Sequence, residues 1–217
     1  MRPALLAVLV LALSAPFARN AQAQEPSTAP VPAGAYTLDK SHTSLIFRFN
    51  HLGFSMYTGR FTRLEANLQF DPRNIASSRV TVDIDPRSIE ADNAPSGFLQ
   101  TLAGKDWLDA EQFPQLSFRS KSVEVTGRDT FRIAGELTLH GVTRPLALDA
   151  RYNGGYAGHP YDPNARVGFS ARGKFKRSDF GMGQFVPEAG SSFGVGDDIE
   201  VILESEFSGP PLKTQAQ

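Results

Sequence analysis

Cysteine is absent from the sequence, which excludes disulfide bonds, thiolate metal sites, iron–sulfur clusters and cysteine nucleophiles. Tryptophan occurs once and phenylalanine 16 times, so the aromatic content is concentrated in one purely apolar side chain. Neither sign of charge dominates, since 22 lysines and arginines stand against 23 aspartates and glutamates. This near balance lacks the basic excess of a nucleic-acid-binding protein, and we expect no nucleic-acid partner.

The only long apolar run lies at the N-terminus and has the features of a cleaved secretory signal. Arg2 precedes the apolar residues 4–13, which are too few to span a bilayer, and small residues suit cleavage after Ala23. We expect a signal peptide at residues 1–23, with cleavage after Ala18 as a weaker alternative, and export to the periplasm. The remaining chain of about 194 residues is large enough for one hydrophobic core without disulfides.

Composition divides the rest of the chain into one domain and two short ends. Residues 24–35 are rich in proline and alanine without periodicity, and residues 209–217 are similar, so a flexible leader and a flexible tail are expected. Residues 36–208 form the predicted domain. They contain no stretch that is long and apolar enough for a transmembrane helix.

Within this domain, apolar residues recur at every second position in short segments separated by Gly, Pro, Asn and Asp. This alternation is typical of antiparallel strands with one buried and one solvated face. An eighth segment, residues 116–125, changes its apolar face near Ser120, which predicts a β-bulge or sharp bend. Eight strands fit a two-sheet sandwich or a closed all-β barrel, and we favour the barrel because closure removes exposed edges and can enclose a ligand. The seven regular segments are residues 45–49, 64–70, 80–84, 131–139, 146–152, 167–175 and 199–207.

Residues 92–114 depart from the strand pattern. Asn93 or Ser96 is available as a helix N-cap, and Gly104 as a stop. We therefore expect a short helical lid, at about residues 95–111, over a barrel end or along its wall. Its apolar residues at helical spacing are Phe98, Leu99 and Leu102, and a second turn is expected to carry Trp107 and Leu108.

The histidines are the first residues to test as metal ligands or acid–base groups. His42 and His51 are nine residues apart, so in a regular strand they point to opposite faces, and no pair has helical metal-site spacing. We expect polar histidines at strand ends, with no metal site and no cofactor. His51 shares the parity of Phe47 and Phe49, which makes it a candidate polar contact facing inward. The four histidines are His42, His51, His140 and His159.

Other catalytic motifs are weak. The Gly-x-Ser-x-Gly spacing occurs once, in "GSSFG" at residues 190–194, but an expected strand follows it and no convincing helix does, so it lacks the context of an activated serine. The pairs Asp83/Asp85 and Asp197/Asp198 fit turns and solvated positions better than the two carboxylates of a glycosidase. The basic stretch "RGKFKR" at residues 172–177 predicts a solvated outer face. It would attract an anionic headgroup or a membrane surface only if its end lay near the barrel mouth.

Five stretches occur in a defined order: "YTLDKSHTSLIFRFNHLGFSMYTGRF", "FDPRN" followed by "VTVDIDPRSIEAD", "WLDAEQFPQLSFRSKSVEV", "GELTLHGVTRPLALDARYNG" and "ARVGFSARGKFKRSDFGM". Their order and spacing, over residues 35–207, resemble the YceI-like family of lipid- or polyisoprenoid-binding proteins. The resemblance implies an extended lipocalin-like antiparallel barrel, usually periplasmic. It also implies that a long apolar cavity holds an isoprenoid or another amphiphilic chain.

This resemblance makes the inward-facing apolar residues the predicted ligand-binding wall. Small residues interrupt the wall, and they leave room either for larger neighbours in a solid core or for a ligand. The predicted wall consists of Leu45, Phe47, Phe49, Phe61, Leu68, Val82, Phe118, Leu137, Leu139, Phe169 and Phe175. The predicted polar or lid contacts are His51, Phe98, Leu99, Leu102 and Trp107.

The lid departs from the family pattern. Family members typically have an Arg-Asp pair followed by His-Leu, where this chain has Phe98-Leu99 and then Thr101-Leu102. A charged position has become apolar. The change favours a neutral amphiphile, such as a quinone or a fatty amide, over an anionic phosphate headgroup.

We therefore expect non-catalytic binding, storage or transport of an isoprenoid or similar amphiphilic lipid in the periplasm. One alternative is a hydrolase or isomerase that acts on a lipid-like substrate in the same cavity, using His51 or His140 with a carboxylate. Another is a solid-core, stress-related interaction module. The expected partner is the lipid ligand, while a transient membrane contact and a homodimer are compatible with the sequence but not required by it.

Overall fold

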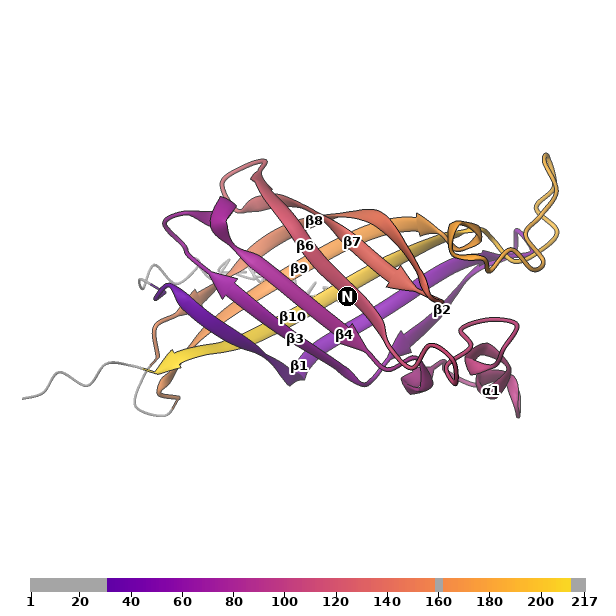
Figure 1. Ribbon diagram of the computed structural model, residues 1–217, viewed down its shortest axis with the longest axis horizontal. Helices are drawn as coiled ribbons and strands as arrows, with labels where there is room; N and C mark the ends of the chain where they lie inside the picture. Colours follow the sequence, from indigo (N-terminus) through magenta and orange to yellow (C-terminus); the bar gives the residue numbers. More distant parts are fainter. Residues whose placement is uncertain (1–30, 159–161, 212–217) are drawn as a thin grey trace, which may run out of the picture.

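The computed structural model describes residues 31–158 and 162–211, which form a closed antiparallel β-barrel (Figure 1). Its eight wall strands are hydrogen-bonded in the order β10-β9-β8-β7-β6-β4-β3-β1, and a β10–β1 pairing closes the wall. This confirms the predicted eight-stranded barrel. The wall strands are β1 (Gly34–His51), β3 (Leu64–Phe70), β4 (Arg79–Ile84), β6 (Leu116–Val125), β7 (Thr130–Leu139), β8 (Val142–Tyr156), β9 (Asn164–Lys176) and β10 (Asp198–Pro211).

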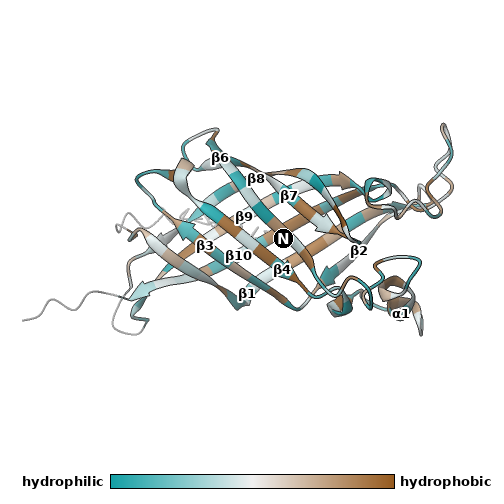
Figure 2. Ribbon diagram, in the orientation of Figure 1, coloured by the Kyte–Doolittle hydropathy of each residue, from teal (hydrophilic) through white to brown (hydrophobic). Residues whose placement is uncertain are grey.

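Alternation of apolar and polar residues explains which side of each strand faces inward (Figure 2). In β3 every second residue, from Leu64 to Phe70, is buried, and the residues between them are exposed. The outer face carries ion pairs between neighbouring strands, such as Lys174 Nζ to Asp198 Oδ2 at 3.1 Å. Exposed pairs of this kind add little stability each, so burial of the inward face is the main source of stability.

Register shifts occur at several places in the wall, including β6 and β1. In β6 the pairing with β7 shifts register between Ser120 and Ser122, which confirms the predicted bulge. In β1 the pairing with β10 shifts between Asp39 and Ser44, so β1 bends. Its first residues pair with β3 and its last with the short β2 (Ser55–Phe61), which in turn pairs with β5 (Ile89–Glu90).

The two ends of the barrel differ because β1 pairs with β3 at one end and with β2 at the other. We call the end where β1 finishes and β10 begins the mouth end, and the opposite one the far end. The helix α1 (Phe98–Ala103) contacts β5 at the mouth end. Three 3₁₀ turns complete the described elements: η1 (Ile75–Ser77), η2 (Pro86–Ser88) and η3 (Arg177–Phe180).

The lid is less helical than the sequence predicts. Its only α-helix is the six-residue α1, and the segment after it forms turns rather than a second helical turn at Trp107. The N-cap is Gly97 in the left-handed region (φ 81°), not Asn93 or Ser96, whereas Gly104 ends the helix as predicted. Backbone bonds inside the turns replace helical ones. Leu108 N donates to Leu102 O at 3.1 Å, and Ala110 N donates to Ala103 O at 2.9 Å.

The domain extends beyond its predicted limits at both ends. Strand β1 begins at Gly34, which pairs with Phe70, and Val31 is buried, so the end of the expected leader belongs to the barrel. Strand β10 continues to Pro211, so residues 209–211 of the expected tail belong to the wall. The predicted signal peptide, the rest of the leader and residues 212–217 lie outside the described residues. No described helix has the length and apolar character needed to cross a bilayer.

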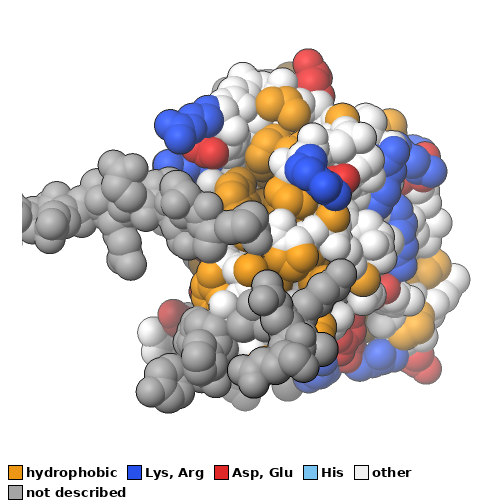
Figure 3. Space-filling model, turned by 90° about the vertical axis from the view of Figure 1, so that its left-hand side faces the viewer, with side chains coloured by type: hydrophobic (Ala, Val, Ile, Leu, Met, Phe, Trp, Pro, Cys, Tyr) orange, Lys and Arg blue, Asp and Glu red, His pale blue; other side chains and the backbone are white. Residues whose placement is uncertain are grey.

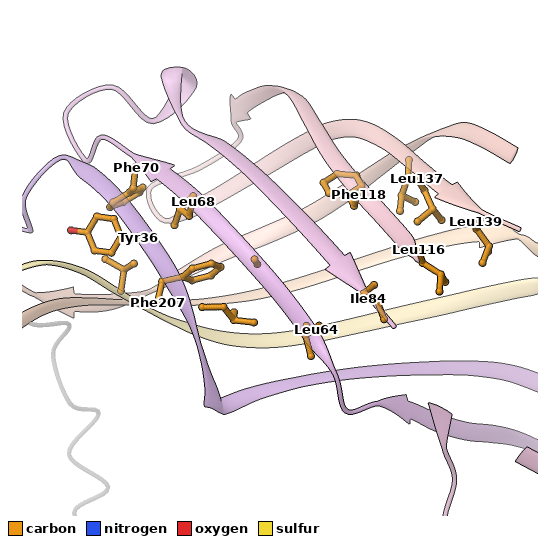
Figure 4. Packing of buried hydrophobic residues seen from close by; sticks show 14 of the residues in the cluster. Tyr36, Leu64, Leu68, Phe70, Ile84, Leu116, Phe118, Leu137, Leu139 and Phe207 are labelled. Atoms are coloured by element: carbon orange, nitrogen blue, oxygen red, sulfur yellow. The ribbon is translucent and has the colours of Figure 1, made fainter. Parts of the chain in front are cut away.

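Aromatic side chains pack the far end (Figure 4). Tyr36, Phe70 and Phe207, from β1, β3 and β10, converge there, and the Tyr36 and Phe70 ring centroids are 6.0 Å apart. Tyr36 Oη donates a hydrogen bond to Pro32 O at 2.7 Å, and burial raises the pKa of Tyr36 to about 12. Charged side chains border the apolar patch that is visible on this end of the surface (Figure 3). Aromatic side chains therefore close the far end.

Candidate functional site

The interior at the mouth end is hollow. A cavity of about 180 Å³ lies between the strands and the lid, and its accessible wall is entirely apolar. Nine of the predicted wall residues line it: Leu45, Phe47, Phe49, Phe61, Val82, Phe118, Leu137, Leu139 and Phe175. Further lining residues that the prediction omitted are Ile84, Leu116, Leu146, Leu148, Ile199, Val201 and Leu203.

A second, smaller cavity of about 80 Å³ lies toward the far end. The other two predicted wall residues, Leu68 and Phe169, line this second cavity rather than the main one. Its wall is also apolar apart from a few residues such as Ser78 and Ser205. One layer of side chains borders both cavities, and it consists of Val82, Phe118, Leu148, Ala171 and Leu203.

The space beside the small residues of the wall shows whether the core is solid. A Cβ at Gly135 would lie 2.5 Å from Phe118 Cζ, and one at Gly173 would lie 2.5 Å from Leu148 Cδ2, so larger neighbours fill the space beside both glycines. Ala171, in contrast, borders both cavities. The interior is therefore partly packed and partly open.

The lid closes the mouth-end cavity from one side. Of the predicted lid contacts, Leu102 and Trp107 line the cavity, and Ile89 of β5 lines it as well. Phe98 and Leu99 are not lining residues, but they pack against the cluster that contains Phe47, Phe49 and Leu102. Phe98 and Leu99 therefore fix the lid to the barrel.

The lid is fastened to the loop at residues 181–197, which connects η3 to β10. The rings of Trp107 and Phe185 are stacked, with centroids 6.3 Å apart and planes at 21°. Gln184 Nε2 donates a hydrogen bond to Asp106 O, and the guanidinium of Arg177 lies 5.4 Å from the Trp107 ring. The cavity is therefore covered by two segments that hold each other.

Arg177 anchors that loop and was not predicted as a site residue. Its side chain is only 3% exposed, and its guanidinium donates to four backbone carbonyls. Nε bonds to Gly196 O at 3.0 Å, and Nη2 bonds to Gln184 O and Val195 O, both at 2.7 Å. Nη1 donates to Met182 O. Burial lowers the pKa of Arg177, and the charge of Asp197 opposes that shift.

The sequence contained a signal for this anchor. Lys174 and Lys176 are exposed and paired with Asp198 and Asp197, as expected for the outer face of "RGKFKR". Arg177 follows Lys176 directly, so two adjacent basic residues break the alternation where β9 ends and η3 begins. A basic residue out of phase with its strand is a candidate for a buried one.

The histidines do not form a site within the described residues. His51 is exposed and lines neither cavity, so its predicted inward contact is wrong; its backbone pairs instead with Val195. His42 faces outward, and His140 Nδ1 lies 3.0 Å from Phe180 O, with its ring against Phe113. His159 falls outside the residues described.

A charged network lies on the outer wall. Asp39, His42 and Glu206 place ligand atoms within 4.8 Å of one another, which is a geometry that metal sites share. Here the guanidinium of Arg166 hydrogen-bonds to Asp39, and Arg166 Nη1 lies 3.9 Å from Glu206 Oε2. The carboxylates therefore already face a cation that belongs to the protein.

Residues 36–207 match the model of the YceI-like domain. The chain belongs to the YceI-like family. It is 33% identical to a UPF0312 protein of Vibrio cholerae over 185 residues, covering 84% of this chain and 89% of that protein. Among solved structures, a YceI protein of Campylobacter jejuni has a TM-score of 0.62 at 28% identity, covering 74% of this YceI-like chain and 90% of that one.

The same fold occurs at greater sequence distance. A polyisoprenoid-binding domain from Saccharophagus degradans has a TM-score of 0.60 at 12% identity, covering 82% of this chain and all of that domain. At such identity the likeness concerns the fold alone. Distant sequences thus share the extended barrel of this YceI-like chain. The properties of its cavity have to be argued from its own side chains.

Chemically, the cavity of this YceI-like barrel is suited to binding. Among the described residues, Arg177 is the only lining residue with an ionisable side chain, and its nitrogens bond to backbone carbonyls. An acid, base or nucleophile that touches a substrate inside would have to come from the wall. The wall instead offers hydrocarbon and aromatic surface.

Proposed function

We propose that this YceI-like protein binds the apolar chain of an isoprenoid or similar amphiphilic lipid inside the barrel, and stores or carries it without chemical change. The observation that carries the proposal is the mouth-end cavity, which is hollow and has an entirely apolar wall. Export to the periplasm, directed by residues 1–23, is part of the proposal. The description of the Saccharophagus degradans domain as polyisoprenoid-binding gives the same class of ligand on the same fold.

Burial of hydrocarbon is sufficient to drive such binding. Each methylene moved from water into an apolar site contributes about 0.8 kcal/mol, so a dozen carbons contribute roughly 10 kcal/mol. Association and the ordering of a flexible chain take back several kcal/mol of that total. A lipid of this length would therefore bind tightly without any polar contact in the wall.

The headgroup would lie outside the apolar wall, at the lid. Phe98 and Leu99 are packed into the lid cluster, and Arg177 is engaged by backbone carbonyls, so neither position offers a free charge to a phosphate. A neutral headgroup, such as a quinone ring or an amide, would lose less on leaving water. We therefore favour an isoprenoid quinone or a fatty amide over a polyprenyl phosphate.

The single tryptophan gives a direct test, because Trp107 lines the cavity. We expect an isoprenoid quinone, added from detergent micelles, to quench Trp107 fluorescence saturably at one molecule per protein. Phe49→Asp should abolish quenching, since a carboxylate would enter an apolar wall. Val125→Asp is the matched control, because Val125 is exposed on β6 and lines neither cavity.

Three outcomes would count against the proposal. Absence of quenching by isoprenoid quinones, together with no retention of fatty amides or polyprenyl phosphates in native mass spectrometry, would contradict lipid binding. Equal quenching in a folded Phe49→Asp variant would move the ligand out of this cavity. Chemical conversion of the added lipid, seen by mass spectrometry, would favour a hydrolase or isomerase instead.

A further inference from the structure

Exposed apolar side chains gather at the mouth end. Among the described residues, five large hydrophobic side chains are exposed, and four of them belong to the β1–β2 hairpin or to the loop at residues 181–197. Isolated exposed hydrophobic residues are common, but a group of them marks an interaction surface. The most exposed are Phe54, at 82%, and Phe193, at 77%.

The two segments that carry these phenyl rings lie against each other. Leu52 N donates to Gly194 O at 2.9 Å, and Gly196 N donates to Asn50 O at 2.7 Å. A Cβ at Gly53 would lie 2.8 Å from Ser192 Oγ. Phe54 and Phe193 are thus each next to a residue at this contact, and they form one tip, which we call the aromatic tip.

The backbone holds the tip in a fixed shape. Leu52 adopts a positive φ of 56°, which is costly for a residue of this size. Phe54 N donates to His51 O at 2.9 Å, and Gly53 N donates to Asn50 Oδ1 at 2.8 Å. The turn is therefore held in a strained conformation that keeps Phe54 away from the core.

The aromatic tip lies at the mouth end, next to residues that line the cavity. Met182 and Val195, at the two bases of the 181–197 loop, are both lining residues. Figure 1 shows this loop, in orange, projecting beyond the barrel at the same end as α1. A surface that the tip touches would therefore face the entrance of the cavity.

We propose that the aromatic tip docks on the surface of a phospholipid bilayer and inserts Phe54 and Phe193 among the lipids at the cavity entrance. Projecting phenyl rings on two tight turns suit a deformable apolar medium, into which each ring is buried without a preformed pocket. The membrane is then the surface from which the lipid is taken, which goes beyond the proposed function. Docking itself does not require lipid binding in the cavity, but its biological purpose rests on the proposed function.

Charge narrows the class of membrane. Residues 49–59 contain no lysine, arginine, aspartate or glutamate. The charged residues in the loop at residues 181–197 are Glu188 and Asp197, and both are acidic. Anionic membranes recruit proteins through clustered lysine and arginine, and the tip has neither. Docking would therefore depend on apolar insertion, occur on zwitterionic lipid and persist at high salt.

Flotation with phosphatidylcholine vesicles, without added quinone, tests this docking on the full exported chain. We expect the wild-type protein to float with the vesicles at low and high salt. Loss of one phenyl, in Phe54→Ser or Phe193→Ser, should lower the partition coefficient about tenfold, and loss of both about a hundredfold. Val125→Ser, which removes an exposed apolar side chain elsewhere on the barrel, should float like the wild type.

Failure to float, or equal flotation of the double variant, would overturn the proposal. A dimer seen by sedimentation equilibrium that the double variant loses, without flotation, would assign the tip to a second copy of the chain. Micelle-delivered quinone keeps the two proposals separate. The double variant should retain full Trp107 quenching by quinone delivered from micelles, but it should take up quinone from vesicles more slowly. A wild-type protein that floats with vesicles but shows no quenching would contradict only the proposed function.

Discussion

The ring of Phe118 lies over the backbone of Gly135, with Cζ 2.5 Å from the position that a Cβ at residue 135 would occupy. Phe118 also borders both cavities, so its ring forms part of the layer between them. A side chain at residue 135 would collide with this ring, so the glycine allows Phe118 to occupy its position between the cavities. Replacing Phe118 would therefore change the length of the apolar space inside the barrel.

We expect Phe118→Ala to join the two cavities and shift preference toward longer chains. Removing the ring opens the space between the mouth-end and far-end cavities, so a longer prenyl chain could bury more carbons. The unfolding free energy should fall by about 3 kcal/mol, as is usual for a buried Phe→Ala change. Trp107 quenching by quinones of increasing chain length measures the shift, and an unchanged length profile would show that the chain does not reach the layer.

The stacking of Trp107 on Phe185 should slow the release of a ligand from the cavity. Phe185→Ala removes the lid contact, and an aromatic pair contributes about 0.5 to 1.5 kcal/mol, so release into micelles should accelerate roughly two- to tenfold. Stability should change little, because Phe185 is 71% exposed. Stopped-flow fluorescence measures release. Phe193→Ala, a phenyl in the same loop, should leave it unchanged, and equal acceleration in both variants would contradict a specific latch.

Arg177 should be the residue whose loss most affects the loop at residues 181–197. Arg177→Met leaves four backbone carbonyls without their donor and should lower the unfolding free energy by about 3 kcal/mol or more. Arg177→Lys keeps the charge, but one nitrogen cannot reach all four acceptors, so an intermediate loss is expected. Hydrogen exchange should rise first in this loop, and uniform exchange across the barrel would contradict the anchoring role.

Asp39 should make stability depend on pH on the acid side. Hydrogen bonds from Ser41, then from Arg166 and His42, hold the pKa of Asp39 well below its usual range. A carboxyl with a depressed pKa stabilises the fold above its unfolded-state pKa, and that contribution is lost as pH falls through the folded-state pKa.

The corresponding variant is Asp39→Asn. It should lower the unfolding free energy by about 1 to 3 kcal/mol at pH 7, and the difference from the wild type should shrink steadily below about pH 4. Urea titrations across this range measure both values. Glu65→Gln, which removes an exposed partner of Lys40, should show almost no difference at any of these pH values.

Much of the wall was predictable from strand parity. Burial on one face leaves a period of two, so Phe47, Phe49, Leu137 and Leu139 could be placed inside before any coordinates were known. The bulge near Ser120 was predictable for the same reason, because the apolar face changes there. Strand β2, with its sequence "SMYTGRF", was missed because its mouth-end residues are largely exposed and do not alternate.

The site around the mouth was less predictable because its contacts join distant segments. Arg177, Met182 and Val195 come together through backbone carbonyls that no side-chain pattern reveals. The cap at Gly97 was missed because a left-handed glycine replaces the usual side-chain cap. His51 was placed inward by parity, yet the strand ends there and its side chain is exposed. Parity fixes the face to which a side chain points, but not whether the barrel interior still extends beneath it at the end of a strand.

Extraction of the protein purified from its native host tests the central claim most directly. Organic extraction followed by mass spectrometry should recover one class of isoprenoid or similar amphiphile at close to one molecule per barrel. The same extraction of Phe49→Asp should recover almost none. Recovery of no lipid from the wild-type protein, or of equal amounts from both proteins, would contradict the account.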